Sequence, residues 1–212
     1  MKVDHHHDAR LNSNPKESDV ASLPPSATGF VYEISTGEFT DVSFLGQASS
    51  AAMAINNTNT LVGVVTPYGD SFEQDALGRQ RVIRPAGVPV TADDISDTGV
   101  VVGLVSDSSG FLYDFRWRNA KAQQIIIPGA PTAVVNGISP TANALVGTYS
   151  PAAPTDSFLY EKGAVQRLAY PGAIDTYAYG VNGAGQVSGL YLNKTGGTHA
   201  FIWTPPTPLP AK

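Results

Sequence analysis

A phenylalanine recurs through most of the chain at an almost constant spacing. The last four members of this series are 43 residues apart and the first precedes them by 42; they are Phe30, Phe72, Phe115, Phe158 and Phe201. A second series consists of glycines inside short apolar segments, at Gly63, Gly103, Gly147 and Gly189. A fixed period of about 20–50 residues is the signature of repeat architectures, in which each repeat covers the apolar face of its neighbour. The chain must therefore fold as a series of similar repeats.

Each repeat contains four short apolar segments separated by turn residues. In the repeat around Phe115 these segments are 93–96, 101–104, 115–117 and 124–126, and Asp97-Thr98-Gly99 makes a tight turn between the first two. β-branched and aromatic residues are enriched in the segments, and no window of about 11 residues shows a helical period without an internal Gly or Pro. We expect strands throughout, with the first two segments of each repeat forming a hairpin.

Four short antiparallel strands in about 43 residues is the size of one β-propeller blade. The predicted fold is all-β, a β-propeller-like array of four-stranded repeats. Two segments before the first full repeat, three full repeats and three segments after them make 17 strands. Four blades are favoured, with five as the alternative. With four blades, Phe39–Val42 would complete the last blade beside His199–Trp203, and Phe30–Tyr32 would remain as an edge strand that invites self-association.

The two repeated residue types are interpreted as structural. The phenylalanine is expected to fill the space between adjacent blades, with Phe201 as buried as Phe115 and Phe158, and with Phe30 less so. The glycine weakens its strand intrinsically, so it is expected to mark a close backbone approach near the crowded centre.

Segments of different composition flank the repeats. Residues 1–28 are polar and have no hydrophobic period, which predicts a tail or a tag-like leader. Its His5, His6 and His7 lie between aspartates and are a weak candidate metal site. The folded repeat domain is expected to span 29–203, and 204–212 is a proline-rich C-terminal tail.

The repeats resemble the family called HAF repeats. The likeness is carried by 45–63, by 171–189 and by the tripeptide His199-Ala200-Phe201 that names the family. The resemblance implies an extracellular or cell-surface β-propeller-like protein. The family has no established chemistry, so the resemblance implies no catalytic residue.

Composition excludes several function classes. The net charge of −5 argues against a nucleic-acid binder, because such proteins normally present a basic surface. No apolar run approaches the roughly 18 residues of a membrane-spanning helix. The chain has no cysteine, so it has no disulfide and no thiolate chemistry. No phosphate loop or dinucleotide fingerprint is present, and no cofactor is expected.

A catalytic constellation is also not found in the sequence. His199 is the single histidine of the repeats, and no serine lies in a Gly-x-Ser-x-Gly elbow. A pair of carboxylates would serve a glycoside hydrolase; the candidates are Asp41, Asp93, Asp94, Asp97, Asp156 and Asp175. Most of them stand in turns or at strand ends, where aspartate commonly accepts hydrogen bonds from its own backbone.

Two patterns suit ligand binding. Four tyrosines lie on neighbouring strands and would offer stacking faces to sugars: Tyr149, Tyr177, Tyr179 and Tyr191. Nearly half of the 13 basic residues gather in two repeats, where they would meet an anionic partner or guard a solvated strand edge: Arg79, Arg81, Arg84, Arg116, Arg118 and Lys121.

The function predicted from these features is a non-catalytic extracellular or surface module that binds a glycan or a surface protein, or serves as an assembly scaffold. Two alternatives stay open. One is a polysaccharide-active glycoside hydrolase or lyase on a propeller scaffold. The other is a structural subunit of a self-assembling fibre or sheet, paired through the strand near Phe30.

Overall fold

The computed structural model describes residues 27–45, 47, 49–65, 69–106, 112–130, 132–149 and 155–206. The predictions for the tail up to residue 26, for His5, His6 and His7, and for the tail beyond residue 206 lie outside this part of the chain. Within it the protein is all-β, which confirms the predicted fold class, a β-propeller built from repeated four-stranded blades. The helical structure described amounts to the single turn Pro85–Gly87, so no described helix is long enough to cross a membrane.

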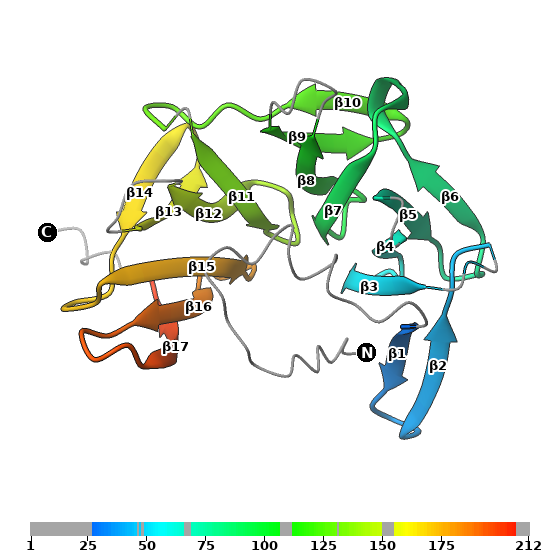
Figure 1. Cartoon of the computed structure of the whole chain (residues 1–212), viewed down its shortest axis with the longest axis horizontal. Coiled ribbons are helices and arrows are strands. Elements are labelled where there is room, and N and C mark those ends of the chain that lie inside the picture. The colour runs from blue at the N-terminus through cyan, green and yellow to red at the C-terminus, as the bar shows by residue number, and fades with distance from the viewer. Residues whose placement is uncertain are drawn as a thin grey trace, which may run out of the picture. The chain divides into compact units, whose positions relative to one another are not determined.

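The chain divides into two compact units, 1–125 and 126–212. The first described strands of unit 1 form the hairpin β1 (Gly29–Glu33) and β2 (Glu38–Val42), which lies below β3 in Figure 1. Two four-stranded antiparallel sheets follow, each in sequence order: β3 (Ser50–Ile55), β4 (Leu61–Val65), β5 (Asp70–Gln74) and β6 (Gln80–Ile83); then β7 (Val90–Ile95), β8 (Val101–Ser106), β9 (Leu112–Arg118) and β10 (Lys121–Gln124).

Unit 2 contains one four-stranded and one three-stranded sheet. The first consists of β11 (Ala133–Ile138), β12 (Ala144–Tyr149), β13 (Ser157–Glu161) and β14 (Ala164–Leu168). The second consists of β15 (Asp175–Val181), β16 (Val187–Leu192) and β17 (Thr198–Trp203). Within the described residues the last sheet therefore has one strand fewer than the other three, and β17 is its outermost strand.

Phe39–Val42 belongs to β2, which pairs along its whole length with β1, from Gly29 opposite Val42 to Glu33 opposite Glu38. The four-residue connection closes with Gly37 at φ 75°, and the Gly37 N–H donates to the Glu33 carbonyl at 2.8 Å. Closing so short a loop costs little chain entropy, which favours this local hairpin. The expected pairing of Phe39–Val42 with His199–Trp203 would join residues of the two different units and stays a prediction.

The first strand of each larger sheet begins earlier than the sequence pattern suggests and contains a β-bulge at the same repeat position. The extra residues are Met53, Asp93, Asn136 and Tyr179. The polar residue after each strand belongs to the turn. The Oδ1 atom of Asn56, for example, accepts hydrogen bonds from the backbone N–H groups of Thr58 and Thr60. An asparagine or serine here offers the backbone the partners that make the turn.

The repeated glycine lies directly opposite the repeated phenylalanine in every larger sheet. The pairs are Gly63–Phe72, Gly103–Phe115, Gly147–Phe158 and Gly189–Phe201. A Cβ atom on Gly63 would lie 2.6 Å from the Phe72 ring and would also overlap with the carbonyl oxygen of Ala51 on the preceding strand. The close approach is thus to the glycine's own sheet, because the phenylalanine ring lies over the bare backbone.

Within each unit the apolar core lies between successive sheets. Phe72 packs with Val31 and Val42 of the β1–β2 hairpin. Phe115 packs in the same way with Val62 and Ile83 of the preceding sheet. In unit 1 the repeated ring therefore packs against the sheet before its own.

Burial of the repeated ring changes at the two ends of the series. Phe72, Phe115 and Phe158 are at most 1% exposed. Phe30 is half-buried, and so is Phe201, contrary to the expectation that Phe201 would be as buried as the central rings. The reason is that β17 is the outermost strand of its sheet and has a strand neighbour on one side only.

In two of the repeats a buried serine before the phenylalanine joins its sheet to the next one in the same unit. The Ser71 hydroxyl donates to the Val90 carbonyl at 2.7 Å and accepts from the Ala92 N–H at 2.8 Å. Two repeats later, Ser157 makes the same two bonds to Thr176 and Ala178, at 2.8 and 2.7 Å. We call this arrangement the serine clasp. The last repeat has the exposed Ala200 at this position and cannot make it.

Candidate functional site

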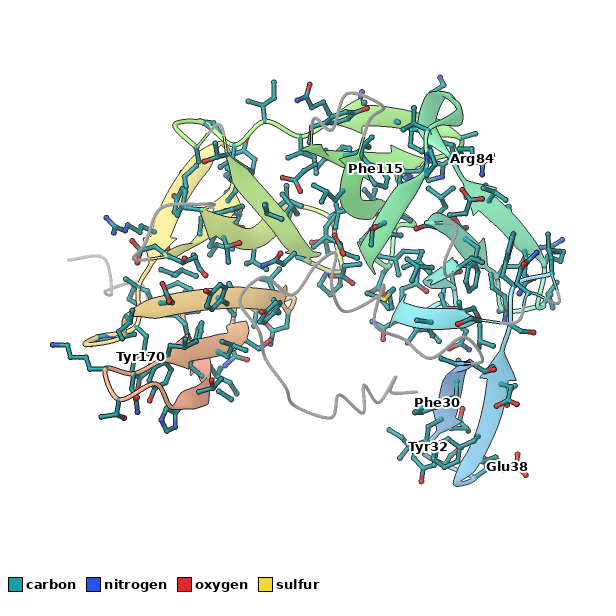
Figure 2. The ribbon with its side chains drawn as sticks, viewed as in Figure 1. Phe30, Tyr32, Glu38, Arg84, Phe115 and Tyr170 are labelled. Atoms are coloured by element: carbon teal, nitrogen blue, oxygen red, sulfur yellow. The ribbon has the colours of Figure 1, made fainter. Side chains whose placement is uncertain are left out.

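Three aromatic rings stack along the β15–β17 sheet. The Tyr170 and Tyr191 ring centroids are 3.7 Å apart with the planes 5° from parallel, and those of Tyr191 and His199 are 5.2 Å apart at 26°. The strand register places Thr176, Tyr191 and His199 in one row across the sheet. Tyr170 joins this row from the loop after β14, because its N–H donates to the Thr176 hydroxyl at 2.9 Å. Figure 2 shows Tyr170 beside this sheet. We call the three rings the aromatic stack.

Both ends of the aromatic stack reach the surface. Tyr170 is 39% exposed and His199 is exposed, while Tyr191 lies between them and is half-buried. A ligand therefore meets Tyr170 and His199 first, and Tyr191 mainly aligns the other two rings.

Asn193 sets the polar end of the aromatic stack. Its Oδ1 atom accepts hydrogen bonds from the N–H groups of Thr195 and Gly197 in the β16–β17 turn. The amide nitrogen is thereby directed to His199 Nε2, 2.9 Å away. Because an amide NH₂ can only donate, we assign Nε2 as the acceptor and Nδ1 as the nitrogen that carries the hydrogen. The Nδ1–H is then a hydrogen-bond donor for a ligand.

The Tyr191 hydroxyl is a neutral hydrogen-bonding group. Hydrogen bonding with Tyr170 raises the pKa of the Tyr191 phenol above its ordinary value of 10.0, and desolvation acts in the same direction. The phenol therefore stays protonated at physiological pH, and its hydroxyl is able both to donate and to accept hydrogen bonds.

The four tyrosines singled out in the sequence are not brought together. Tyr177 lies opposite Leu190 and so projects from the other face of the sheet than Tyr191 does. Tyr179 stands in the bulge of β15. Tyr149 lies on β12, with its ring centroid 5.5 Å from that of Phe158. A ligand role for Tyr149, Tyr177 and Tyr179 stays a prediction.

Sequence analysis missed Tyr170 and Asn193. Tyr170 precedes the Pro171-Gly172 turn and stands outside every strand, so the strand period does not reveal it. Asn193 carries a weak signal, since asparagine followed by Lys194-Thr195-Gly196-Gly197 is typical of a turn.

Most of the candidate carboxylates have structural partners. Asp97 accepts hydrogen bonds from the N–H and the side-chain amide of Asn57 in the neighbouring sheet of unit 1, at 2.9 and 2.8 Å. Asp175 accepts from the Thr155 N–H at 2.7 Å, and Asp156 forms an ion pair with Arg167.

The three other candidate carboxylates lie on β2 and β7. Asp94 accepts a hydrogen bond from the Ile95 N–H, Asp93 stands in the bulge of β7, and Asp41 is exposed on β2. No group of three or more histidine, aspartate or glutamate side chains within the described ranges is arranged to hold a metal ion.

The basic residues of the β5–β6 region are balanced by carboxylates. Arg79 pairs with Asp75 at 2.6 Å, Arg81 with Glu73 at 2.7 Å, and Arg84, labelled in Figure 2, pairs with Asp70. Hydrogen bonding to Asp70 raises the pKa of Arg84, so its charge is permanent. The other basic candidates, Arg116, Arg118 and Lys121, lie on the β9–β10 hairpin. The β5–β6 cluster therefore presents paired charges rather than a basic surface.

Comparison with known proteins identifies the fold. No family model matches the sequence, and no curated protein matches it. Among solved structures, the chain is similar to TolB of Acinetobacter baumannii, with a TM-score of 0.66 and 14% identity over 85% of this chain and 47% of that one. For TolB of Agrobacterium tumefaciens the TM-score is 0.65 and the sequence identity is 11%, over 82% of this chain and 65% of that one.

The β-propeller domain of the Trilobed protease from Pyrococcus furiosus gives a TM-score of 0.53 and 12% identity, over 82% of this chain and 58% of that one. The chain thus spans about half to two thirds of these three structures. At such low identity the likeness shows the fold alone. The chain has a β-propeller fold.

Proposed function

We propose that this protein is a non-catalytic surface or extracellular repeat module that binds glycans at the aromatic stack. The observation that carries the proposal is the alignment of Tyr170, Tyr191 and His199, which is open to solvent at both ends. Aromatic faces with a polar edge suit sugar rings, because the sugar packs its C–H groups on the ring while its hydroxyls bond to neighbouring polar atoms.

The polar groups that would meet sugar hydroxyls come from the same three strands and loops. They are the phenol oxygens of Tyr170 and Tyr191, the Nδ1–H of His199 and the remaining hydrogen-bonding capacity of the Asn193 amide. None of these groups belongs to a carboxylate, a lysine or an arginine, which favours a neutral glycan. They are held by the paired strands of one sheet and by its turns, so less entropy is lost when the ligand binds.

Two further observations support a binding module over a hydrolase. The candidate carboxylates Asp97, Asp156 and Asp175 already hold turns and ion pairs together. The resemblance to the HAF-repeat family, in turn, supports a place outside the cell. Release of reducing sugar from plant or microbial polysaccharides by the purified protein would overturn the non-catalytic part of this proposal.

A glycan array followed by calorimetric titration tests the binding. We expect the wild-type protein to bind at least one neutral glycan, and Tyr170→Ala and His199→Ala each to weaken that affinity at least tenfold. Phe39→Ala is the matched control, because Phe39 is an aromatic side chain that is 65% exposed on the β1–β2 hairpin of unit 1. An array without any bound glycan, or an equal loss in the Phe39 variant, would contradict the proposal.

A further inference from the structure

The outer edge of β17 is open. Among the described residues β17 pairs with β16 alone, and its sheet has three strands where β3–β6, β7–β10 and β11–β14 have four. An open edge presents unpaired backbone N–H and C=O groups and is a template for another strand. In the part of the chain that the structure describes, this sheet ends at β17, one strand earlier than the repeated pattern.

The side chains of β17 do not protect this edge. The outermost strands β6, β10 and β14 each carry a basic residue, at Arg81, Lys121 and Arg167 respectively, and charged side chains on an edge strand discourage pairing with another chain. β17 has the sequence Thr-His-Ala-Phe-Ile-Trp, without a formally charged residue or a proline. The edge is thus open to pairing along its six residues.

Exposure of β17 shows how much surface a partner would cover. In the equivalent strand β13, Ser157, Phe158 and Leu159 are all buried. In β17 the corresponding Ala200 and Ile202 are exposed and Phe201 is half-buried, with 74% of the Ile202 side chain accessible. An isoleucine so exposed in the middle of an uncharged edge strand is typical of an interaction surface.

The residues directly after β17 are poorly suited to extend its sheet. Thr204 is followed by Pro205 and Pro206, which have no backbone N–H to donate to a ladder.

We propose that β17 pairs with β17 of a second copy of this chain, antiparallel about a two-fold axis. The two three-stranded sheets then form one continuous six-stranded sheet. A two-fold interface brings identical surfaces together, so a strand pairs with itself only if its side chains do not repel each other. The uncharged β17 satisfies this requirement, and the exposed Ile202 side chains become covered across the junction.

Single cysteines test the proposal directly, because the natural chain has no cysteine. Thr198→Cys, Ala200→Cys and Ile202→Cys place one thiol each along the exposed face of β17. With mild diamide oxidation, at least one of them should form a disulfide-linked dimer in high yield. Ala164→Cys, on the outermost strand β14, is the matched control and should form no disulfide-linked dimer. Equal cross-linking of the control and the β17 variants would overturn the proposal.

Sedimentation of the unmodified protein gives an independent readout. We expect a monomer–dimer equilibrium whose dissociation constant rises at least tenfold in Ile202→Lys, since the substitution places like charges at the junction. Val82→Lys, at an exposed position on β6, should leave the equilibrium unchanged. A chain that is monomeric at all concentrations would overturn the proposal. So would protection of the β17 amides from hydrogen exchange in the dilute monomer, which would mean that a segment of the same chain covers the edge.

The two proposals fail separately. Ile202→Lys removes the dimer but leaves the aromatic stack in place, so a single copy should keep its intrinsic glycan affinity. His199→Ala and Tyr170→Ala weaken glycan binding. Because Tyr170 lies outside β17, Tyr170→Ala should leave the dimer intact.

Discussion

The sheets β11–β14 and β15–β17 are two copies of the same repeating unit. They differ in the burial and hydrogen bonding of the residues that contact a neighbouring strand or sheet. Phe158 is fully buried on β13, which has a strand on each side, whereas Phe201 is half-buried on β17, which has one. Ser157 bonds to the next sheet, whereas Ala200 has no hydroxyl with which to do so. The comparison shows that a residue at a repeated position is buried or hydrogen-bonded only where a neighbouring strand or sheet is present. The incomplete sheet is also the one that carries the aromatic stack and the open edge.

The largest expected difference concerns the repeated phenylalanine. Phe158→Ala should lower the free energy of unfolding by about 3–5 kcal/mol, the usual loss for a fully buried aromatic ring. Phe201→Ala should cost about 1–2 kcal/mol, because part of that ring is already in water. Chemical denaturation of both variants measures the difference. Equal losses would show that Phe201 is as buried in solution as Phe158.

The strand glycine opposite each phenylalanine gives the next effect. Gly147→Ala should cost about 3 kcal/mol, because the added methyl group overlaps with both the Phe158 ring and the carbonyl oxygen of Val134. Gly189→Ala creates the same overlap with Phe201 and Tyr177, but the outermost strand β17 is able to shift, so the loss should be smaller. Chemical denaturation of both glycine variants measures the two losses in the free energy of unfolding. A larger loss at Gly189 would mean that β17 is held more firmly than β13.

The serine clasp should have a moderate effect. Ser157→Ala leaves the Thr176 carbonyl and the Ala178 N–H buried without this partner, and we expect it to cost about 2 kcal/mol. The reverse change in the last repeat, Ala200→Ser, should leave stability unchanged because the position is exposed. Chemical denaturation of both variants measures how far each substitution changes the free energy of unfolding. A clear gain from Ala200→Ser would indicate that another element covers this face.

The smallest effect concerns the other incomplete sheet, the β1–β2 hairpin. The backbone N–H and the hydroxyl of Ser35 donate to the Glu33 carboxylate and lower its pKa below 4.5. A carboxyl with a lowered pKa stabilises the folded state above its ordinary pKa and loses this contribution as the pH falls through the folded value.

An NMR titration of the Glu33 side chain measures this directly. Its midpoint should lie below 4.5 and should rise toward 4.5 in Ser35→Ala, which removes the hydroxyl and keeps the backbone bond. Because Glu33 lies on the hairpin at the solvent surface, we expect only the hairpin to respond. An unchanged midpoint in Ser35→Ala would show that the backbone N–H alone lowers the pKa.

The fold class followed from sequence because its signals are local and repeated. The 43-residue period, the strand glycine and the turn residues each recur several times, so a chance match at one position does not mislead. The bulge in each first strand was missed, since a bulge inserts a residue without changing the composition of the strand. Ser96 was included in the strand segment 93–96, although its hydroxyl accepts a hydrogen bond from the Val100 N–H and so belongs to the turn.

The aromatic stack was only partly accessible from sequence. Tyr191 was recognised as a candidate, and His199 as the single histidine of the repeats, but nothing in the sequence pairs them with Tyr170. Tyr170 precedes Tyr191 by 21 residues and reaches it through one loop whose course depends on the hydrogen bond to Thr176. Contacts of this kind depend on how a loop packs against a sheet, for which no periodic signal exists.

The sequence alone determined the repeating unit of this protein: its length, its strands, and the Gly–Phe pair that lets a ring lie on each sheet. These features are set by neighbours in the same repeat and hold wherever the repeat occurs. Tertiary structure decided contacts that no periodic pattern carries, such as the bulge in each first strand and the stacking of Tyr170 on Tyr191. The physical reason is that these contacts depend on how a loop closes and packs against a sheet, and not on the residues of one repeat alone.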